Sequence, residues 1–227
     1  MASPTGPEAV RAAMTVAQKQ KRAEEMLEDL PLPKVKPDNM DRLRKAVEHT
    51  YTDGRYAKLQ QVGKEVGVDP DELVLYTAIE KRREENMGNP GVSSASASGE
   101  FQITDATRKL FAHITDPDPY VQDAKIAAHL IKDIRKRLDP SEKFQVAAYN
   151  AGEGTLRGWA EGKEKLGQET INYLAYAPEV RRMIQERKVE RARKREEDAV
   201  KSAATPPAPA PEYGLDVAAN YWQGKPL

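Results

Sequence analysis

Hydrophobic residues recur at helical spacing along most of the chain, and no segment shows the strict alternation of a half-buried strand. The segments with this spacing are residues 8–30, residues 38–66, the stretches that begin at Asp69, Thr104, Asp116 and Asp139, and residues 168–201. Short strands are expected only near Gly99–Ile103. The pattern therefore predicts an all-α fold with one small β element.

The helix expected from Asp69 has the clearest boundaries. Aspartate is favoured at an N-cap and proline at the first helical position, which is the order of Asp69 and Pro70. An apolar run over 73–79 follows, then the charged run 80–85, and Gly88 ends the helix. The charged run reads Glu-Lys-Arg-Arg-Glu-Glu.

Changes in composition divide the chain into five segments. They are an N-terminal helix with a Pro-rich linker (1–37), a helical lead-in with a turn at Gly54 (38–66), a main domain (67–180), a charged helix (181–204), and a Pro/Ala-rich spacer with an aromatic docking segment (205–227). The first helix has few large apolar residues, which suits an exposed arm that docks on something else. The last segment is expected to be an extended tail.

Composition excludes several classes of site. Lys+Arg and Asp+Glu each number 36, so global charge gives no argument for nucleic acid or for an anionic membrane. The chain has no cysteine, which excludes disulfides and thiolate metal sites. The three histidines, His49, His113 and His129, are scattered and read as ordinary helix-surface residues. No metal or cofactor is therefore expected.

Neither a membrane span nor a secretory signal is expected. No run approaches the roughly 18 apolar residues of a membrane helix. The first residues, Met-Ala-Ser-Pro-Thr-Gly-Pro, precede a polar helix and lack the apolar core of a signal peptide. An enzyme of the cell wall with this start would need another route to its substrate.

Three blocks of residues carry the candidate chemistry. Residues 99–104 read Gly-Glu-Phe-Gln-Ile-Thr, residues 147–152 read Ala-Ala-Tyr-Asn-Ala-Gly, and residues 169–173 read Glu-Thr-Ile-Asn-Tyr. With them, the chain over roughly 67–180 resembles the soluble, goose-type-lysozyme-like lytic transglycosylases of the SLT-domain family. The family pattern runs Glu-Ser at a helix end, Gly-Ala-x-Gly-Leu-Met-Gln-Ile, Ala-Tyr-Asn-Ala-Gly and Glu-Thr-x-x-Tyr-Val.

The resemblance implies a lysozyme-like helical domain that cuts peptidoglycan glycan strands. In such enzymes one glutamate acts as acid and then as base, and a substrate hydroxyl replaces the second carboxylate that most glycosidases use. Gln102 would bind saccharide, Tyr149 would reach the catalytic glutamate or the sugar, Asn150 would hold that region, and Tyr173 would line the cleft. No cofactor is implied.

The catalytic glutamate is the point where the sequence departs from the family, because Glu-Ser does not occur. The usual separation of 18 residues before Gln102 gives Glu84, in the last turn of its helix. Glu80 is the alternative, because it directly follows the apolar run. Helical geometry places both on one face, with Tyr76, while Glu85 points away. The separation favours Glu84 narrowly.

Two functions remain open at this point. The first is a lytic transglycosylase carried in a bacteriophage virion, which opens the host cell wall during infection and binds other virion proteins through 1–37 and 205–227. The second is a catalytically degenerate, lysozyme-like structural or binding protein of a virion or of a secretion assembly. No nucleic-acid partner is indicated.

Overall fold

The computed structural model of the chain describes residues 14–52, 54–87, 96–138 and 140–204, and it leaves the side chains of 82–87, 137–138 and 201–204 undescribed. Contacts divide the chain into two units, Met1–Glu186 and Arg187–Leu227. The first unit contains all the blocks singled out above. The tail 205–227, predicted to be extended, lies outside the described residues.

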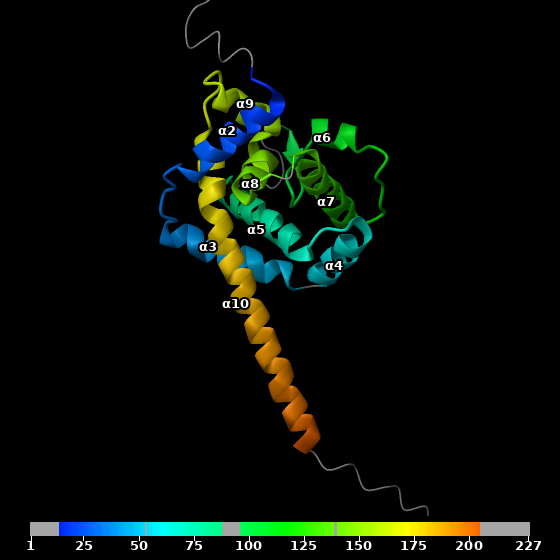
Figure 1. Cartoon of the computed structure of the whole chain (residues 1–227). Helices are drawn as coiled ribbons and strands as arrows, with labels where there is room; N and C mark the ends of the chain where they lie inside the picture. The colour runs from blue at the N-terminus through cyan, green and yellow to red at the C-terminus, as the bar shows by residue number, and fades with distance from the viewer. Residues whose placement is uncertain (1–13, 53, 88–95, 139, 205–227) are drawn as a thin grey trace, which may run out of the picture. The chain divides into compact units, whose positions relative to one another are not determined.

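The first unit is built almost entirely from helices (Figure 1). In chain order the helices are α2 (Val16–Glu28), α3 (Pro37–Thr50), α4 (Arg55–Val66), α5 (Pro70–Met87), α6 (Asp105–Leu110), α7 (Pro119–Leu138), α8 (Glu142–Ala151), α9 (Glu153–Ala160) and α10 (Gln168–Ala204). Between α5 and α6, β1 (Ala97–Ser98) and β2 (Ile103–Thr104) pair antiparallel, with Ala97 opposite Thr104. The all-α prediction with one small β element is confirmed.

Helix α5 is the centre of the fold. Every residue from Leu73 to Glu80 is buried, so the helix presents no polar stripe to water over this span. Helices α3, α4 and α7 pack against it. A helix that is apolar on all sides is stable only inside a protein, which explains why the apolar run over 73–79 becomes the core.

Short-range caps fix where several helices begin. The Asp69 carboxylate accepts a hydrogen bond from the Asp71 amide (2.9 Å), and Asp118 accepts one from the Tyr120 amide (2.9 Å). Thr104 caps α6 through the Thr107 amide (3.1 Å). The start predicted at Asp139 is wrong by a few residues, because Ser141 caps α8.

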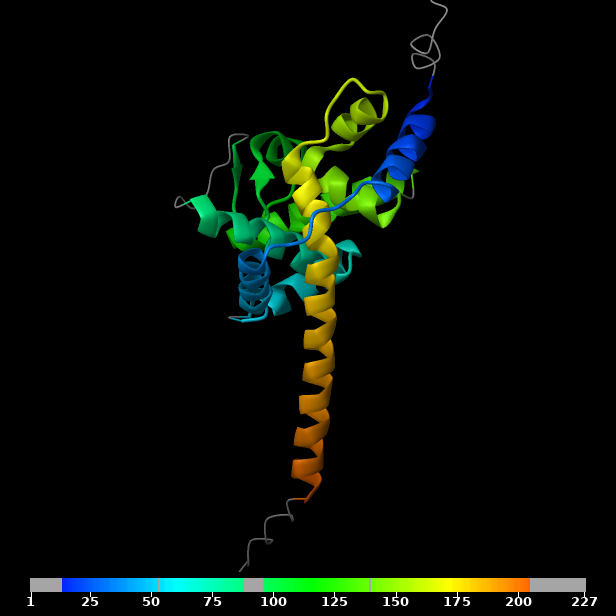
Figure 2. The same ribbon diagram turned by 90° about the vertical axis from the view of Figure 1, so that its left-hand side faces the viewer.

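The N-terminal helix is part of the domain. Helix α2 packs on α8 and α9, as Figure 2 shows beside the green helices. Ala23 and Leu27 are fully buried in this contact, and Lys19 pairs with Glu161 at the C-terminal end of α9 (2.5 Å). The expectation of an arm that docks elsewhere is therefore corrected for residues 16–28, whose apolar face is covered by the same chain.

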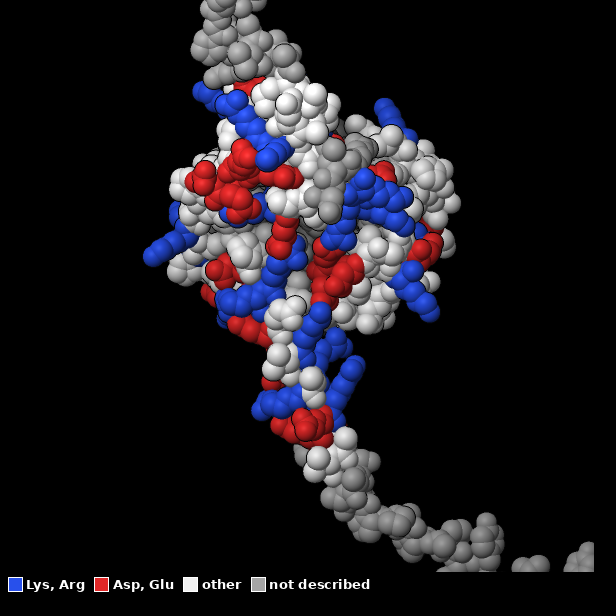
Figure 3. All heavy atoms as spheres, in the orientation of Figure 1, with Lys and Arg blue, Asp and Glu red and all other residues white. Residues whose placement is uncertain are grey.

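Helix α10 is continuous across the boundary between the two units, although Pro178 lies inside it. Its first part buries Tyr173, Leu174, Val180 and Ile184 in the core. From Arg191 to Val200 all side chains are exposed, and Arg and Lys residues are followed there by Glu and Asp residues (Figure 3). Pairs such as Arg193–Glu190 (3.0 Å) link successive turns, as expected for a solvated charged helix.

None of the helices over the described ranges is long and apolar enough to cross a membrane.

Candidate active site

Glu80 is a buried carboxyl group at the end of the apolar run of α5. Only 3% of the residue is exposed, and the two preceding residues, Ala78 and Ile79, are fully buried. Charged side chains are rarely buried to this extent unless other groups surround and stabilise them. The surroundings of Glu80 therefore decide what it can do.

Three tyrosines form a cluster beside this carboxyl group. The rings of Tyr76 on α5 and Tyr149 on α8 are stacked with their centroids 4.0 Å apart, at an interplanar angle of 25°. Tyr173 on α10 lies 6.4 Å from Tyr76 and 6.5 Å from Tyr149, measured between ring centroids. Through Tyr149 and Tyr173, the cluster connects the second and third blocks to the central helix α5.

The pKa values of two of these phenol groups show that Glu80 lies near them. Burial raises the pKa of Tyr149 well above its usual value of 10.0, and the negative charge of Glu80 raises it further. The same two causes, in the same order, raise the pKa of Tyr173. Both hydroxyls therefore stay protonated near neutral pH, and both lie within electrostatic range of the Glu80 carboxylate.

The turn between the two strands presents the first block. Gly99 has φ of +76° and Gln102 has φ of +47°, and the Gln102 amide donates to the Gly99 carbonyl (3.0 Å). The Gln102 side-chain amide donates to the same carbonyl (2.9 Å). One end of the Gln102 side chain thus stabilises its own turn, in an uncommon conformation for a residue other than glycine.

An ion pair between α6 and α7 holds this turn in place. Arg108 of α6 binds both carboxylate oxygens of Asp123 on α7 (2.5 and 3.0 Å) and also the Ser98 carbonyl (3.2 Å). Asp123 lies so close to the turn that a Cβ atom on Gly99 would meet its Oδ2 at 2.1 Å. Glycine is therefore favoured at 99 both by its φ and by the Asp123 carboxylate, which Arg108 holds in place.

Two backbone carbonyls of the turn connect it to the tyrosine cluster. The Tyr149 hydroxyl donates to the Phe101 carbonyl (3.2 Å), and the Thr77 hydroxyl donates to the Glu100 carbonyl (3.3 Å). Phe101 is fully buried. These contacts place the turn that carries Gln102 against α5 and α8, next to the part of α5 that ends in Glu80.

Asn150 joins the second block to the third. Its amide nitrogen donates to Glu169 (2.9 Å), and its amide oxygen accepts from the Thr170 hydroxyl (2.8 Å). The bonds fix the first turn of α10 on the end of α8. Because Tyr173 lies one turn further along α10, Asn150 helps to set the position of that tyrosine.

The structure brings Glu80, Tyr149 and Tyr173 together, with Gln102 on the adjoining turn and Asn150 behind. Glu84 lies on α5, and its side chain is outside the described residues. The sequence-based list of site residues lacked Tyr76, although its place on the Glu80 face of the helix was a signal for it. Across the described ranges, no group of three His, Asp or Glu side chains is placed to hold a metal.

Comparison with known proteins agrees with the three blocks. Residues 61–172 match the family described as the transglycosylase SLT domain. No curated protein matches the chain. An inactive mutant of the lytic transglycosylase Slt from Pseudomonas aeruginosa is similar at 17% identity, with a TM-score of 0.35. The match covers 78% of this chain and 30% of that one, and a TM-score this low gives no support for the fold.

Proposed function

We propose that this protein is a peptidoglycan lytic transglycosylase in which Glu80 is the catalytic acid and base. The observation that carries the proposal is the burial of Glu80 beside Tyr149 and Tyr173, which belong to two blocks that resemble the family pattern. The match of residues 61–172 to the SLT family supports the same chemistry.

The proposed reaction cleaves the β-1,4 bond between N-acetylmuramic acid and N-acetylglucosamine. Glu80 gives its proton to the glycosidic oxygen while the bond from the anomeric carbon to that oxygen breaks. The C6 hydroxyl of the muramic acid then bonds to the anomeric carbon, and its proton returns to the Glu80 carboxylate. The product is a 1,6-anhydro sugar, and the enzyme ends in its starting protonation state. No water is consumed.

The environment of Glu80 suits a proton donor. A carboxyl group removed from water favours its neutral form, which is the form that the first step needs. The hydroxyls of Tyr149 and Tyr173 stay protonated near neutral pH. The Tyr173 hydroxyl can donate a hydrogen bond to the carboxylate that forms when the proton leaves, while the Tyr149 hydroxyl donates to the Phe101 carbonyl and holds the strand turn. One glutamate and neutral neighbours are sufficient for this reaction.

We prefer Glu80 to Glu84 as the acid. The spacing to Gln102 favoured Glu84 narrowly, but the contacts described for Tyr149 and Tyr173 are with Glu80. An acid at position 80 lies 22 residues before Gln102, so the connecting loop would be four residues longer than the family spacing of 18. Glu84 lies one turn further along the same face of α5 and is the alternative.

The remaining site residues would bind the glycan. Gln102 would contact saccharide from the strand turn, and Tyr173 would line the groove near the scissile bond. Asn150 would act indirectly, because both of its amide atoms are used to hold Glu169 and Thr170. Tyr149 would reach Glu80 or the sugar with its hydroxyl group.

The test is the release of 1,6-anhydromuropeptides from purified sacculi, followed by chromatography and mass spectrometry. The wild-type protein is expected to release them, Glu84→Gln to keep most of that activity, and Glu80→Gln to lose it by at least about 1000-fold. Thermal unfolding of both variants controls for folding. Activity retained by a folded Glu80→Gln variant would contradict the assignment, and loss in Glu84→Gln alone would move it to Glu84.

A second candidate function is glycan binding without cleavage. The replacement of the family Glu-Ser by Glu80-Lys81 favours it, because lysine is larger than serine and carries a charge. In that case the protein would sediment with sacculi and release no product at any pH. Equal pull-down by the wild type and Glu80→Gln, with product from neither, would establish this function.

We also propose that the enzyme acts from a phage particle, where the segments 1–37 and 205–227 would contact other virion proteins. The support is the composition of the tail, in which a Pro-rich spacer precedes Tyr221 and Trp222. Because α2 already packs on α8 and α9, the tail is the better candidate for such contacts. Mass spectrometry of purified particles tests the location, and absence of the protein from them would contradict it.

A further inference from the structure

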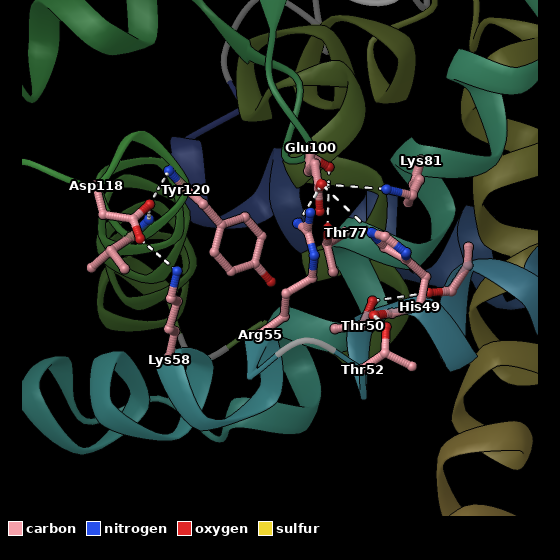
Figure 4. Close-up of polar contacts among 12 residues, drawn as sticks. His49, Thr50, Thr52, Arg55, Lys58, Thr77, Lys81, Glu100, Asp118 and Tyr120 are labelled. Atoms are coloured by element: carbon pink, nitrogen blue, oxygen red, sulfur yellow. Dashed lines mark hydrogen bonds and ion pairs between the residues drawn. The ribbon is translucent and has the colours of Figure 1, made fainter.

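The carboxylate of Glu100 lies close to three basic side chains next to the candidate active site (Figure 4). Its Oε1 atom lies 2.5 Å from Nη1 of Arg55, 3.3 Å from Nζ of Lys81 and 3.9 Å from Nε2 of His49. These residues come from α4, α5 and α3, while Glu100 belongs to the strand turn. We call the four residues the Glu100 cluster.

The cluster is partly shielded from water. The exposed fractions of its side chains are 19% for Glu100 and Lys81 and 26% for Arg55. The Tyr120 ring covers Arg55 with its centroid 5.0 Å from the guanidinium carbon. Charges in such a place interact more strongly than exposed charges, because water screens them less.

Lys81 is the member of the cluster that bears on catalysis. It follows Glu80 directly on α5, so an ammonium group on a four-carbon side chain is attached one residue from the proposed acid. Two departures from the family pattern meet in this contact, since Lys81 stands where the pattern has Ser after the acid and Glu100 stands where it has Leu. In the structure these two residues are paired with each other.

Other groups also face Glu80 or the cluster. Among the side chains that the structure describes, Tyr149 and Tyr173 lie within electrostatic range of Glu80, Tyr76 stacks on Tyr149, and Asp123 of α7 acts on Tyr149. Tyr120 of α7 faces the cluster. The negative charge of Glu100, after burial, raises the pKa of Tyr120. All four phenols therefore remain neutral below pH 9. Lys81 is the cationic residue closest to Glu80 in the sequence.

We propose that Glu100 is a positioning residue that holds the Lys81 ammonium away from Glu80 and so keeps Glu80 able to donate its proton. The proposal rests on the proposed function, in which Glu80 is the acid. Without the Glu100 carboxylate, Arg55 and Lys81 would repel each other. Lys81 would then lack its partner, and the described carboxyl group next to it in the sequence is that of Glu80. An ammonium beside a carboxyl group stabilises the ionised form and weakens the proton donor.

The direction of the effect follows from the role of the acid. A proton donor is active below its pKa and inactive above it, so its pKa sets the alkaline limb of the pH profile of kcat/KM. Glu100→Gln keeps the shape of the side chain and removes the charge. The released Lys81 lowers the pKa of Glu80, and the alkaline limb is expected to move to lower pH by about one unit.

The experiment measures that limb for the wild type, Glu100→Gln, Lys81→Met and the double variant, with release of anhydromuropeptides from sacculi as the readout. Lys81→Met is expected to keep the limb of the wild type, because its ammonium is already held by Glu100. The double variant is expected to regain the position of the limb, because the interfering cation is gone. If Glu100→Gln does not fold, Glu100→Asp replaces it, with a smaller shift in the same direction.

The outcomes separate this proposal from others. A merely structural role of Glu100 lowers the rate at every pH without moving the limb, and Lys81→Met does not rescue it; this result overturns the proposal. An unmoved limb in a folded, active Glu100 variant also overturns it. Failure of the proposed function looks different, because then the wild type releases no product or Glu80→Gln remains active.

Discussion

The ring of Tyr149 stacks on the ring of Tyr76 with their centroids 4.0 Å apart. Tyr149 belongs to the Ala-Tyr-Asn-Ala-Gly block, whereas Tyr76 precedes Glu80 by one helical turn on α5. The contact fixes the phenol of α8 on the central helix, and the hydroxyl of Tyr149 is then directed to the Phe101 carbonyl (3.2 Å). One aromatic pair thus aligns α8, α5 and the strand turn.

Removing the Tyr149 hydroxyl tests whether this alignment serves catalysis. Tyr149→Phe keeps the stacked ring and removes the hydrogen bond to the Phe101 carbonyl that holds the strand turn, so we expect the fold to remain and kcat to fall by roughly 100-fold, as for a small misplacement of a binding group. Steady-state kinetics on soluble glycan chains measures the change. Tyr56→Phe is the control, because its hydroxyl bonds Asp71 (3.0 Å) outside the cluster. A rise in KM with unchanged kcat would argue for binding alone.

The buried tyrosines predict a loss of stability in alkali. Burial raises the pKa of Tyr76, Tyr149 and Tyr173 above the usual 10.0, so the unfolded chain loses these protons first as pH rises. Their contribution is fully present below about pH 10 and falls above it, by up to about 1.4 kcal/mol per pH unit for each group. Urea unfolding between pH 9 and 11.5 measures the slope. Tyr76→Phe should make it shallower by one proton, and an unchanged slope would contradict the burial.

Gly99→Ala is expected to destabilise the protein by about 2–4 kcal/mol. The left-handed backbone of Gly99 costs an alanine about 1–2 kcal/mol, and the new Cβ would displace the Asp123 carboxylate from Arg108. Gly154→Ala is the matched control, because Gly154 lies in α9 and an added Cβ would meet no atom within 4 Å, so it should be neutral or slightly stabilising. Chemical denaturation compares the two. Equal effects would show that the turn is not constrained as described.

Leu27→Ala tests whether α2 belongs to the domain. Leu27 is fully buried, although it lies outside the matched residues 61–172, and its truncation is expected to cost about 2–4 kcal/mol. Val16 on the same helix is 56% exposed, so Val16→Ala should change the free energy of unfolding by less than about 0.5 kcal/mol. Urea titration gives both values. A neutral Leu27→Ala would mean that α2 does not pack on α8 and α9 in solution.

Much of the fold was predictable because the signals are local. The helix starts at Asp69 and Thr104 depend on side chains that bond amides two or three residues away, so the sequence carries them directly. Gly54 was likewise a local signal for the turn that separates α3 from α4, and its φ of +72° is one that glycine adopts readily. The start of α8 was less predictable, since Asp139 and Ser141 are both good caps and their neighbours decide between them.

The candidate site was predictable only in part. The three blocks named Gln102, Tyr149, Asn150 and Tyr173, and their roles in the reaction remain predictions. Helical periodicity placed Glu80 and Glu84 on one face of α5 and had no means of separating them. The contacts with Tyr149 and Tyr173 favour Glu80, because they join residues about 70 and 90 positions apart, which no local pattern encodes.

The sequence by itself determined the helical class, several of the helix starts and the residue types of the site, because each depends on the spacing of apolar residues or on caps within one turn. Only the tertiary structure decided which side chains meet. It placed α2 on α8 and α9, buried Glu80 beside Tyr149 and Tyr173, and paired Lys81 with Glu100. Such contacts depend on how helices pack against one another, since packing brings together groups that lie far apart along the chain.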